Sequence, residues 1–486
     1  MNLQNSYSGL PAMLYTRVDP TAVTAPQLIQ FNAPLAADLQ LDLDPADSQH
    51  LAQLFSGNER LPGSEPIALA YAGHQFGNFV PRLGDGRAVL LGEATDRRGI
   101  LRDIQLKGSG RTPYSRGGDG RAALGPVLRE YLVSEAMTAL GIPSTRSLAA
   151  VLTGEPVYRQ GPLPGAIVTR VATSHVRVGT FQYLAARNDV EALTKLADYL
   201  IDRHYPEVNH TAARYLEFLD AVVARQASLI ARWMHVGFIH GVMNTDNTSI
   251  AGETIDFGPC AFLDSYDPQT VFSSIDHQGR YAFANQPAIA QWNMARFAET
   301  LLPLIAPERE RAISLATNSV NAFAERFEKA WLEGMRAKLG LATSRADDAT
   351  LVAGLLSVMH ETQADYTRTF RSLCADGESL PTGPRGGELQ RPEFDAWLAE
   401  WRQRCADEPL LPQERARRMR SVNPAYIPRN HRIEEVITAA TIRGDLAPFR
   451  TLLEVVSQPF QEQPDKAAYA SAPRAEERVL ATFCGT

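Results

Sequence analysis

The sequence predicts an α+β protein of two lobes: a small strand-rich N-terminal lobe with one key helix, and a larger helical C-terminal lobe with a helical C-terminal extension. Three observations support this prediction. Short apolar runs flanked by glycine fill residues 65–190, as is typical of β-strands. Apolar residues recur at helical spacing after residue 190. A polar motif, residues 240–258, opens the helical part and carries the strongest chemical signal in the chain.

The elements of the first lobe follow from local patterns. A short helix is expected over residues 47–57, within an N-terminal extension of residues 1–64. Strands are expected at three runs in the lobe itself, "RAVLLGEA", "DIQLKG" and "GAIVTRVA". A strong helix, "ALGPVLREYLVSEAMTALG", interrupts them and ends at Gly141 and Pro143. We therefore assign residues 65–190 to the N-terminal lobe.

Helical periodicity dominates the rest of the chain. In "RYLEFLDAVVARQASLIARWMHVG" apolar residues recur three, four and seven positions apart, which predicts an amphipathic helix ended by Gly237. Further helices are expected over residues 285–340 and 346–375, followed by a loop rich in glycine and proline. These patterns give a C-terminal lobe of residues 191–345 and a helical extension of residues 346–486.

Composition restricts the function classes. The chain has 486 residues, of which 44% are hydrophobic and 21% charged, with a formal net charge of −7. It lacks the basic excess of nucleic-acid-binding proteins, so no nucleic acid is expected as a partner. No apolar run reaches membrane-spanning length, and the N-terminus lacks the pattern of a secretory signal. We expect a cytoplasmic enzyme with no membrane partner.

The segment "HGVMNTDNTSIAGETIDFG" is similar to the catalytic core of small-molecule kinases, which have HGDxxxxN followed by an acidic metal ligand. Asn247 and Asp256 match the two metal ligands, because a divalent ion that holds a triphosphate prefers hard oxygen donors. Either fragment alone is more typical of a turn, but their combination favours a metal site. The kinase catalytic aspartate is missing, because Val242 stands in its place.

Lys107 ends the predicted strand "DIQLK" and is a candidate for binding phosphates. In kinases a glutamate on the following helix holds such a lysine. That helix offers Glu130 and Glu135, and we choose Glu130, which lies 23 residues after the lysine. A lysine at a strand end that is simply solvated is the alternative, and only the metal motif downstream argues against it.

Two glycine-rich stretches flank Lys107, at residues 83–88 and 108–122. Glycines let backbone N–H groups approach phosphate oxygens, although either stretch alone is more typical of a hairpin turn. Arg170 and Arg177 follow apolar residues in strand-like sequence. They could bind phosphate bidentately, and a solvent-exposed position is equally compatible with the sequence.

Asp246 is the candidate general base. Removing a proton from a hydroxyl needs a carboxylate within hydrogen-bond reach, which Val242 cannot provide. Asp246 is the only carboxylate between His240 and Ile250, and it adjoins Asn247. It either replaces the missing base or caps the loop, and we favour the first role.

Long segments of the chain resemble the selenoprotein O family, also called YdiU. They are "YAGHQFGNFVPRLGDGRAVLLGE", "QLKGSGRTPYSRGGDGRAALG", "LREYLVSEAMTALGIPSTRSL", "RVATSHVRVGTFQYLA", "HGVMNTDNTSIAGETIDFGP" and "NPAYIPRN". The resemblance implies a bilobal protein-kinase-like fold and a protein adenylyltransferase. Such enzymes bind ATP end for end relative to kinases and move AMP to Ser, Thr or Tyr hydroxyls of proteins.

The resemblance also implies roles for individual residues. Asp246 would be the proton acceptor, and Asn247 and Asp256 would hold Mg²⁺ or Mn²⁺. Arg170 and Arg177 would surround the γ-phosphate of the inverted ATP. The implied nucleotide contacts are Gly84, Gly86, Arg87, Lys107, Asp119, Gly120, Arg170, Arg177 and Asp256, with Glu130 supporting Lys107. Self-modification is expected as a first activity.

The family often carries a redox-active cysteine or selenocysteine near the C-terminus, where this chain has Cys484. Some bacterial members pair theirs with a cysteine in the segment after the DFG-like motif, which in this chain is "IDFG" at residues 255–258. That segment has none here, and Cys260 is the nearest. The resemblance leaves open a Cys260–Cys484 disulfide and two unpaired thiols.

Three other functions remain open from the sequence. The metal motif permits a true kinase, although Val242 argues against one. A nucleotide-binding scaffold without catalysis would not need Lys107, Asp246, Asn247 and Asp256 together. Use of UTP in place of ATP is a variant of the first interpretation, because nothing in the sequence identifies the pocket for the base.

Overall fold

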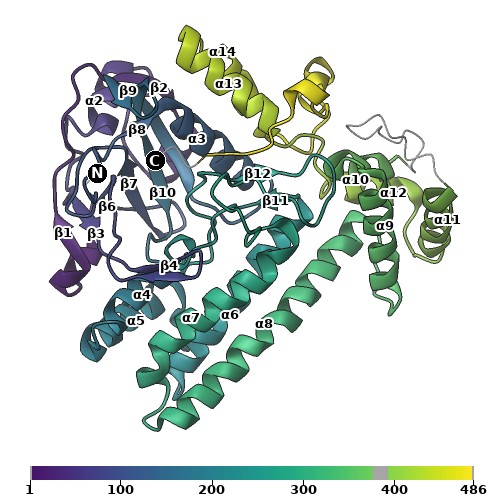
Figure 1. Ribbon diagram of the computed structural model, residues 1–486, viewed down its shortest axis with the longest axis horizontal. Helices are drawn as coiled ribbons and strands as arrows, with labels where there is room; N and C mark the ends of the chain where they lie inside the picture. The colour runs from purple at the N-terminus through teal and green to yellow at the C-terminus, as the bar shows by residue number, and fades with distance from the viewer. Residues whose placement is uncertain (1–2, 376–391, 484–486) are drawn as a thin grey trace.

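The computed structural model describes residues 3–375 and 392–483, and it confirms the predicted α+β class. An antiparallel sheet lies in the N-terminal half, and the C-terminal half is mostly helical (Figure 1). The predicted domain boundaries stay a prediction.

Among the described residues, eight strands form the main sheet, in the order β1-β3-β6-β7-β10-β9-β2 with β8 paired to β10. Its strands run antiparallel to their neighbours. They are β1 (Tyr15–Arg17), β2 (Gln27–Phe31), β3 (Ile67–Leu69), β6 (Ala88–Thr95), β7 (Leu101–Lys107), β8 (Ala122–Ala123), β9 (Arg146–Tyr158) and β10 (Pro162–Ala172). The three predicted strand runs fall on β6, β7 and β10. Strands β1 and β2, from the first 64 residues, form the two edges.

Helices cover both faces of this sheet. Along β10, Ala166 and Val168 belong to the core shared with α3 (Leu124–Ala139), whereas Ile167 and Val171 belong to the core shared with α1 (Ala33–Asp38) and α2 (Ser48–Ser56). This alternation is what a strand buried on two faces produces. It fixes α3, the predicted key helix, against one face of the sheet.

The remaining elements are mostly helices. The long helices α6, α7 and α8 run side by side below the sheet in Figure 1. The helices are α4 (Val178–Ala185), α5 (Val190–His204), α6 (Arg214–His235), α7 (Gln286–Ile305), α8 (Arg309–Lys338), α9 (Asp348–Thr362), α10 (Tyr366–Leu373), α11 (Pro392–Ala406), α12 (Pro412–Arg420), α13 (Asn430–Arg443) and α14 (Ala447–Val456). The 3-10 turns are η1 (Ser6–Gly9), η2 (Ala12–Leu14), η3 (Pro206–Val208), η4 (Thr245–Asn247), η5 (Phe283–Asn285), η6 (Pro464–Tyr469) and η7 (Ala475–Glu477).

Two small hairpins complete the surroundings of the polar motif. Strands β11 (Phe238–Ile239) and β12 (Ala261–Phe262) pair between α6 and α7 and enclose the motif segment. Strands β4 (Gly73–Gln75) and β5 (Asn78–Val80) pair with each other outside the main sheet. Strand β4 lies against η4.

The C-terminal part of the chain returns to the N-terminal half. Helices α13 and α14 pack against α3, where the rings of Tyr131 and Phe449 lie 5.7 Å apart (Figure 1). Further on, the N–H of Thr482 donates to the carbonyl of Phe272 at 2.7 Å. The C-terminal part of the chain therefore packs both on α3 and on the segment that follows the DFG-like motif.

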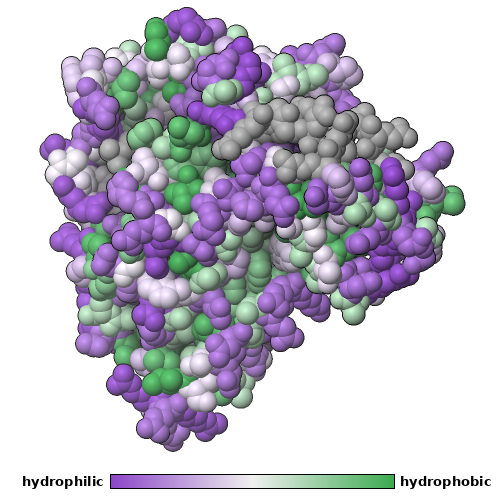
Figure 2. Space-filling model, turned by 45° about the vertical axis from the view of Figure 1, so that its right-hand side comes forward, coloured by the Kyte–Doolittle hydropathy of each residue, from purple (hydrophilic) through white to green (hydrophobic). Residues whose placement is uncertain are grey.

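The molecular surface is mixed in character. On the face drawn in Figure 2, hydrophobic residues form separate patches among hydrophilic ones. Across residues 3–375 and 392–483, no helix combines the length and apolar character needed to cross a bilayer.

Candidate functional site

A pocket of about 570 Å³ lies where the ends of β7 and β10 meet η4 and the DFG-like segment. It is lined by ten of the predicted residues: Gly84, Gly86, Arg87, Lys107, Asp119, Arg170, Arg177, Asp246, Asn247 and Asp256. Glu130 lies behind it, in contact with Lys107. Gly120 lies beside the lining residue Asp119. The fold therefore gathers residues spread over more than 170 sequence positions into one cavity.

The lining of this pocket carries an excess of positive charge. Seven lysine and arginine side chains and four aspartates contribute to it. The protein as a whole has a net charge of −7, so the excess is local. Such a cavity favours an anionic ligand.

Lys107 and Arg170 leave the same face of the sheet from neighbouring strands. Arg170 pairs in register with Gln105, two residues before Lys107. Glu130, on α3, forms ion pairs with both side chains. Lys107 Nζ lies 2.7 Å from its Oε2, and Arg170 Nε binds its Oε1. Burial alone would raise the pKa of Glu130, but Arg170 and Lys107 outweigh it and hold the pKa below its ordinary value. Glu135, the other candidate, instead binds Arg146.

Asp256, in the DFG-like segment, joins the same network. Its Oδ1 lies 2.6 Å from Lys107 Nζ and 2.6 Å from Arg170 Nη2. Burial would raise the pKa of Asp256, but Lys107, Arg170 and Arg177 hold it well below the ordinary range. The residue adopts φ +69°, a left-handed conformation uncommon for a residue other than glycine. Glu130 and Asp256 thus balance the charges of Lys107 and Arg170 in one cluster, of which Asp256 is the most exposed member.

Arg177 precedes α4 and is buried beside Tyr71. Its guanidinium carbon lies 4.4 Å from the centre of the Tyr71 ring, and its Nη1 donates to the backbone carbonyl of Asp246 at 2.9 Å. Arg170 and Arg177 are each only 3% exposed. The solvent-exposed position that the sequence left open is wrong for both arginines.

Asp246 is buried in η4, with 7% of its surface exposed. Burial raises its pKa to about 6, while Gln75 and Arg177 act in the opposite direction. Gln75 Nε2 donates to Asp246 Oδ2 at 3.1 Å. Within the described residues, Oδ1 has no hydrogen-bond partner. Asp246 is therefore a carboxylate with acceptor capacity to spare at the edge of the pocket.

Val242 also lines the pocket, at 7% exposure. Its N–H donates to His240 Nδ1 at 3.3 Å, and its carbonyl accepts from Asn247 Nδ2 at 3.0 Å. The ring of His240 stacks on Trp233, with centroids 5.4 Å apart. The motif histidine and the valine thus fix the loop that carries Asn247.

The glycine-rich loops leave no room for side chains at two of the predicted positions. Gly84 has φ +87°, and a Cβ atom there would lie 2.4 Å from the Tyr114 ring. Gly120 has φ +68°, and its Cβ would lie 2.0 Å from the carbonyl oxygen of Gly110. Asp119 is held by Arg159, whose Nη1 lies 2.8 Å from Oδ2. These contacts hold the two loops in fixed positions at the pocket.

The donor set around Asn247 and Asp256 fits a divalent cation that also binds phosphates. The Asn247 amide nitrogen donates to the Val242 carbonyl, so the metal ligand that this side chain can offer is its amide oxygen. Among the described residues, no cluster of three or more His, Cys, Asp or Glu could hold a metal ion by itself. A small hard cation bound through one carboxylate, with phosphates and water as further ligands, matches this arrangement.

Three of the four cysteines lie in the part of the chain that the structure describes. Cys260 is buried, and its thiol is not in a disulfide. Burial raises its pKa to about 12, so it is a poor thiolate. Cys484, the proposed redox cysteine, lies outside the described residues.

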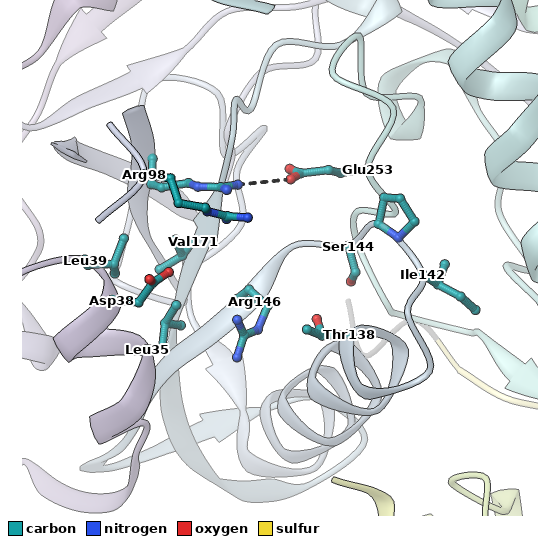
Figure 3. Close-up of a pocket in the computed structure, with 12 residues that line it drawn as sticks. Leu35, Asp38, Leu39, Arg98, Thr138, Ile142, Ser144, Arg146, Val171 and Glu253 are labelled. Atoms are coloured by element: carbon teal, nitrogen blue, oxygen red, sulfur yellow. Dashed lines mark ion pairs between the residues drawn. The ribbon is translucent and has the colours of Figure 1, made fainter. Parts of the chain in front are cut away.

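A second pocket, of about 230 Å³, lies between α1, the end of α3 and Glu253 (Figure 3). Its arginines are matched by carboxylates: Arg102 Nη1 lies 3.5 Å from Glu253 Oε1, and Arg146 Nη2 lies 2.8 Å from Glu135 Oε2. None of its lining residues appears among the described side chains with a buried, unpartnered polar atom. The lining of this pocket holds three arginines and two carboxylates, a smaller positive excess than in the first pocket, and no buried unpartnered acceptor among the described side chains.

Sequence reasoning missed several residues of the site. Gln75, Tyr71 and Asp85 lie in segments that resemble the family, but no pattern marks them individually. Asp85 accepts from Gln105 Nε2 at 3.1 Å beneath the pocket. Arg159, which holds Asp119, lies outside every motif and gave no signal.

A cavity with buried ammonium and guanidinium groups, beside a carboxylate and an amide suited to a divalent cation, is typical of enzymes that act on nucleoside phosphates. The family model described as "Protein adenylyltransferase SelO" matches residues 1–457. The chain is 60% identical over 484 residues to "Protein nucleotidyltransferase YdiU" of Rhizobium rhizogenes, covering 99% of this chain and 96% of that protein. The proteins of the same name from Rhizobium meliloti and Agrobacterium fabrum are 59% and 58% identical, over 99% and 100% of both chains. The chain belongs to the SelO family of protein adenylyltransferases, and it is a protein nucleotidyltransferase.

Proposed function

We propose that this enzyme transfers AMP from ATP to Ser, Thr or Tyr hydroxyls of proteins, on a bilobal kinase-like fold with ATP inverted relative to kinases. Protein and ATP are the substrates that the family implies. The observation that carries the proposal is the changed position of the candidate general base within one pocket. Buried Val242 stands at the kinase aspartate position, while Asp246 supplies a carboxylate four residues later.

The chemistry is an in-line displacement at the α-phosphorus. The substrate hydroxyl oxygen forms the new bond to phosphorus, and the bond from phosphorus to the oxygen shared with the β-phosphate breaks. Asp246 accepts the hydroxyl proton, and pyrophosphate leaves with the electron pair. Asp246 is suited to this step because its carboxylate lines the pocket and its Oδ2, which accepts from Gln75 Nε2, keeps a second acceptor site for the hydroxyl.

The cationic side chains hold the phosphates. Lys107 would bind the leaving pyrophosphate, in register because Glu130 holds its ammonium at 2.7 Å. Arg170 and Arg177 would surround the terminal phosphate, which in this orientation lies deepest. The loops with Gly84, Gly86, Arg87, Asp119 and Gly120 would contact the rest of the nucleotide.

Mg²⁺ or Mn²⁺ would be held by Asn247 and Asp256 and would neutralise phosphate charge when bound. Asp256 Oδ1 is shared by Lys107 and Arg170 before nucleotide arrives. Binding of a triphosphate would give both cations new anionic partners besides Glu130, which would free Asp256 Oδ1 for a metal ion.

The experiment that tests this proposal follows two labels. The protein is incubated with Mg²⁺ or Mn²⁺ and a protein mixture, with ATP labelled on the α- or the γ-phosphate. We expect only the α label on protein, first on the enzyme itself because its own hydroxyls are at high local concentration. The γ label alone would identify a kinase, and neither label a scaffold. A parallel reaction with α-labelled UTP distinguishes uridylyl from adenylyl transfer.

A further inference from the structure

The hairpin β4–β5 is fastened to the loop that carries Asp246 by three consecutive residues. The N–H of His74 donates to Thr245 Oγ1 at 2.7 Å, and the N–H of Phe76 donates to Asn244 Oδ1 at 3.0 Å. Between them, Gln75 Nε2 donates to Asp246 Oδ2 at 3.1 Å. Residues 74–76 therefore bind residues 244–246 at three points, and the middle contact reaches the base itself.

The backbone of this hairpin is held in a conformation that costs energy. Phe76 has φ +50° and the following Gly77 has φ +85°, the signs of a type I′ turn. A bulky residue rarely adopts positive φ, so surrounding contacts must stabilise it. Here the Phe76 ring lies 5.1 Å from the ring of Tyr281, and the Tyr281 hydroxyl donates to the same Asn244 oxygen at 2.7 Å.

Close approach of backbone brings the hairpin onto Asp246. A Cβ atom at Gly73 would lie 2.5 Å from Asp246 Oδ1, so only glycine lets the strand come this near. On the other side, a Cβ atom at Gly179 would lie 3.4 Å from the Asp246 Cα atom and 2.1 Å from the Ala72 carbonyl oxygen. The Asp246 carboxylate thus lies against Gly73 and its backbone against Gly179, and the Gln75 amide is the side-chain donor that sets the rotation of the carboxylate.

We infer that Gln75 is a positioning residue for the transfer reaction, which orients the Asp246 carboxylate toward the acceptor hydroxyl. The inference rests on the role proposed above for Asp246. Each carboxylate oxygen has two acceptor sites, so Oδ2 binds the Gln75 amide and keeps one site for the hydroxyl. Both side chains line the same pocket, so the bond is made where the substrate must arrive.

The test compares four full-length variants with the parent protein: Gln75→Ala, Gln75→Glu, Asn78→Ala and Asp246→Asn. Gln75→Ala removes the donor. Gln75→Glu keeps the shape of the side chain but places an acceptor where a donor is needed. Asn78→Ala is the matched control, because Asn78 lies exposed on the same hairpin and makes no hydrogen bond from its side chain to the described residues near Asp246. For each variant, kcat and KM are measured with α-labelled ATP, and nucleotide affinity is measured by calorimetry.

We expect both Gln75 variants to lose about 10- to 100-fold in kcat, since a small misplacement of a reacting group has this effect. Their KM and affinity for ATP should stay within about twofold of the parent, which a general loss of structure would not produce. Asn78→Ala should behave as the parent. If Gln75→Ala lowers the melting temperature, its lower kcat has a second explanation in lost stability. The kcat of Gln75→Glu then tests the inference.

Two outcomes would overturn the inference. An unchanged kcat in Gln75→Glu would show that the amide does not orient the base, and an increased kcat would show that Gln75 blocks the hydroxyl. Failure of the proposed function itself is distinguishable. In that case Asp246→Asn would retain transfer, whatever the Gln75 variants do.

Discussion

Lys107 Nζ lies 2.6 Å from Asp256 Oδ1, so the predicted phosphate ligand and the predicted metal ligand are bound to each other in the structure. Arg170 binds the same oxygen at 2.6 Å. The free energy of nucleotide binding must therefore include the rearrangement of these contacts. This coupling makes Asp256 important both for folding and for binding.

We expect Asp256→Ala to abolish metal-dependent nucleotide binding, because it removes the only charged metal ligand of the proposed pair. Two cations would then share Glu130 alone, which should lower the free energy of unfolding by about 1–3 kcal/mol. Calorimetric titration with ATP, with and without Mg²⁺, measures the first effect. A variant that binds ATP·Mg²⁺ as tightly as the parent would disprove the metal assignment.

Asp246→Ala should bind nucleotide almost normally and lose transfer. The expected loss is on the order of 10²–10⁴-fold, as is typical for one general base. Single-turnover transfer of the α label and calorimetry on the same sample separate the two properties. An unchanged rate would reduce Asp246 to a residue that caps its loop.

Val242→Asp should not create a kinase. An inverted nucleotide would present the wrong phosphate to the new carboxylate. Val242 is 7% exposed, so an unpartnered charge there should cost about 1–3 kcal/mol of stability. The γ-labelled assay checks the activity and urea denaturation checks the stability. Transfer of the γ-phosphate to protein would refute inverted binding.

Gly73→Ala should disturb the base without touching the nucleotide. The new methyl group would lie 2.5 Å from Asp246 Oδ1, so the carboxylate or the hairpin must move. We expect a fall in kcat of about 10- to 100-fold. Gly9→Ala is the control, because a Cβ atom there meets nothing within 4 Å. An equal kcat for the two variants would mean that the hairpin moves to accept the methyl group without displacing the Asp246 carboxylate.

Stability should fall in mild acid because of His204. Burial lowers the pKa of this histidine to about 3, below its value of about 6.5 in an unfolded chain. As the pH falls below 6.5, the histidine binds a proton in the unfolded state but stays neutral in the folded state, so the free energy of unfolding decreases. The expected contribution is roughly 1–2 kcal/mol between pH 7 and pH 5. Urea midpoints at both pH values should differ less in His204→Gln than in the parent, and an equal difference would contradict the assignment.

Individual strands and helices of this fold can be predicted from the sequence, whereas the elements against which they pack cannot. The short apolar runs flanked by glycine correspond to β6, β7 and β10, and α3 and α6 are followed by Gly141 and Gly237 as expected. β9 was not predicted, because "TGEP" within it resembles a turn, and a neighbouring strand on each side stabilises it instead. Pairings of this kind depend on distant segments, which local patterns do not encode.

The same distinction applies to the site. Lys107, Asn247 and Asp256 could be proposed from the sequence because kinase-like phosphate and metal sites use fixed residue types at fixed spacing, and the three residues line one pocket in the structure. Gln75 and Arg159 are not, because each acts through one hydrogen bond to a residue in a distant segment, Asp246 or Asp119. The burial of Arg170 and Arg177 likewise depends on tertiary packing rather than on strand-like sequence.

The packing of α13 and α14 on α3 also bears on how the protein is made in the cell. Tyr131 on α3 meets Phe449 on α14, which is synthesised about 300 residues later. At ordinary rates of translation the ribosome needs roughly 15–60 s to cover that distance. During this interval α13 and α14 do not yet cover the apolar face of α3. We expect chaperones that bind nascent chains to bind this face.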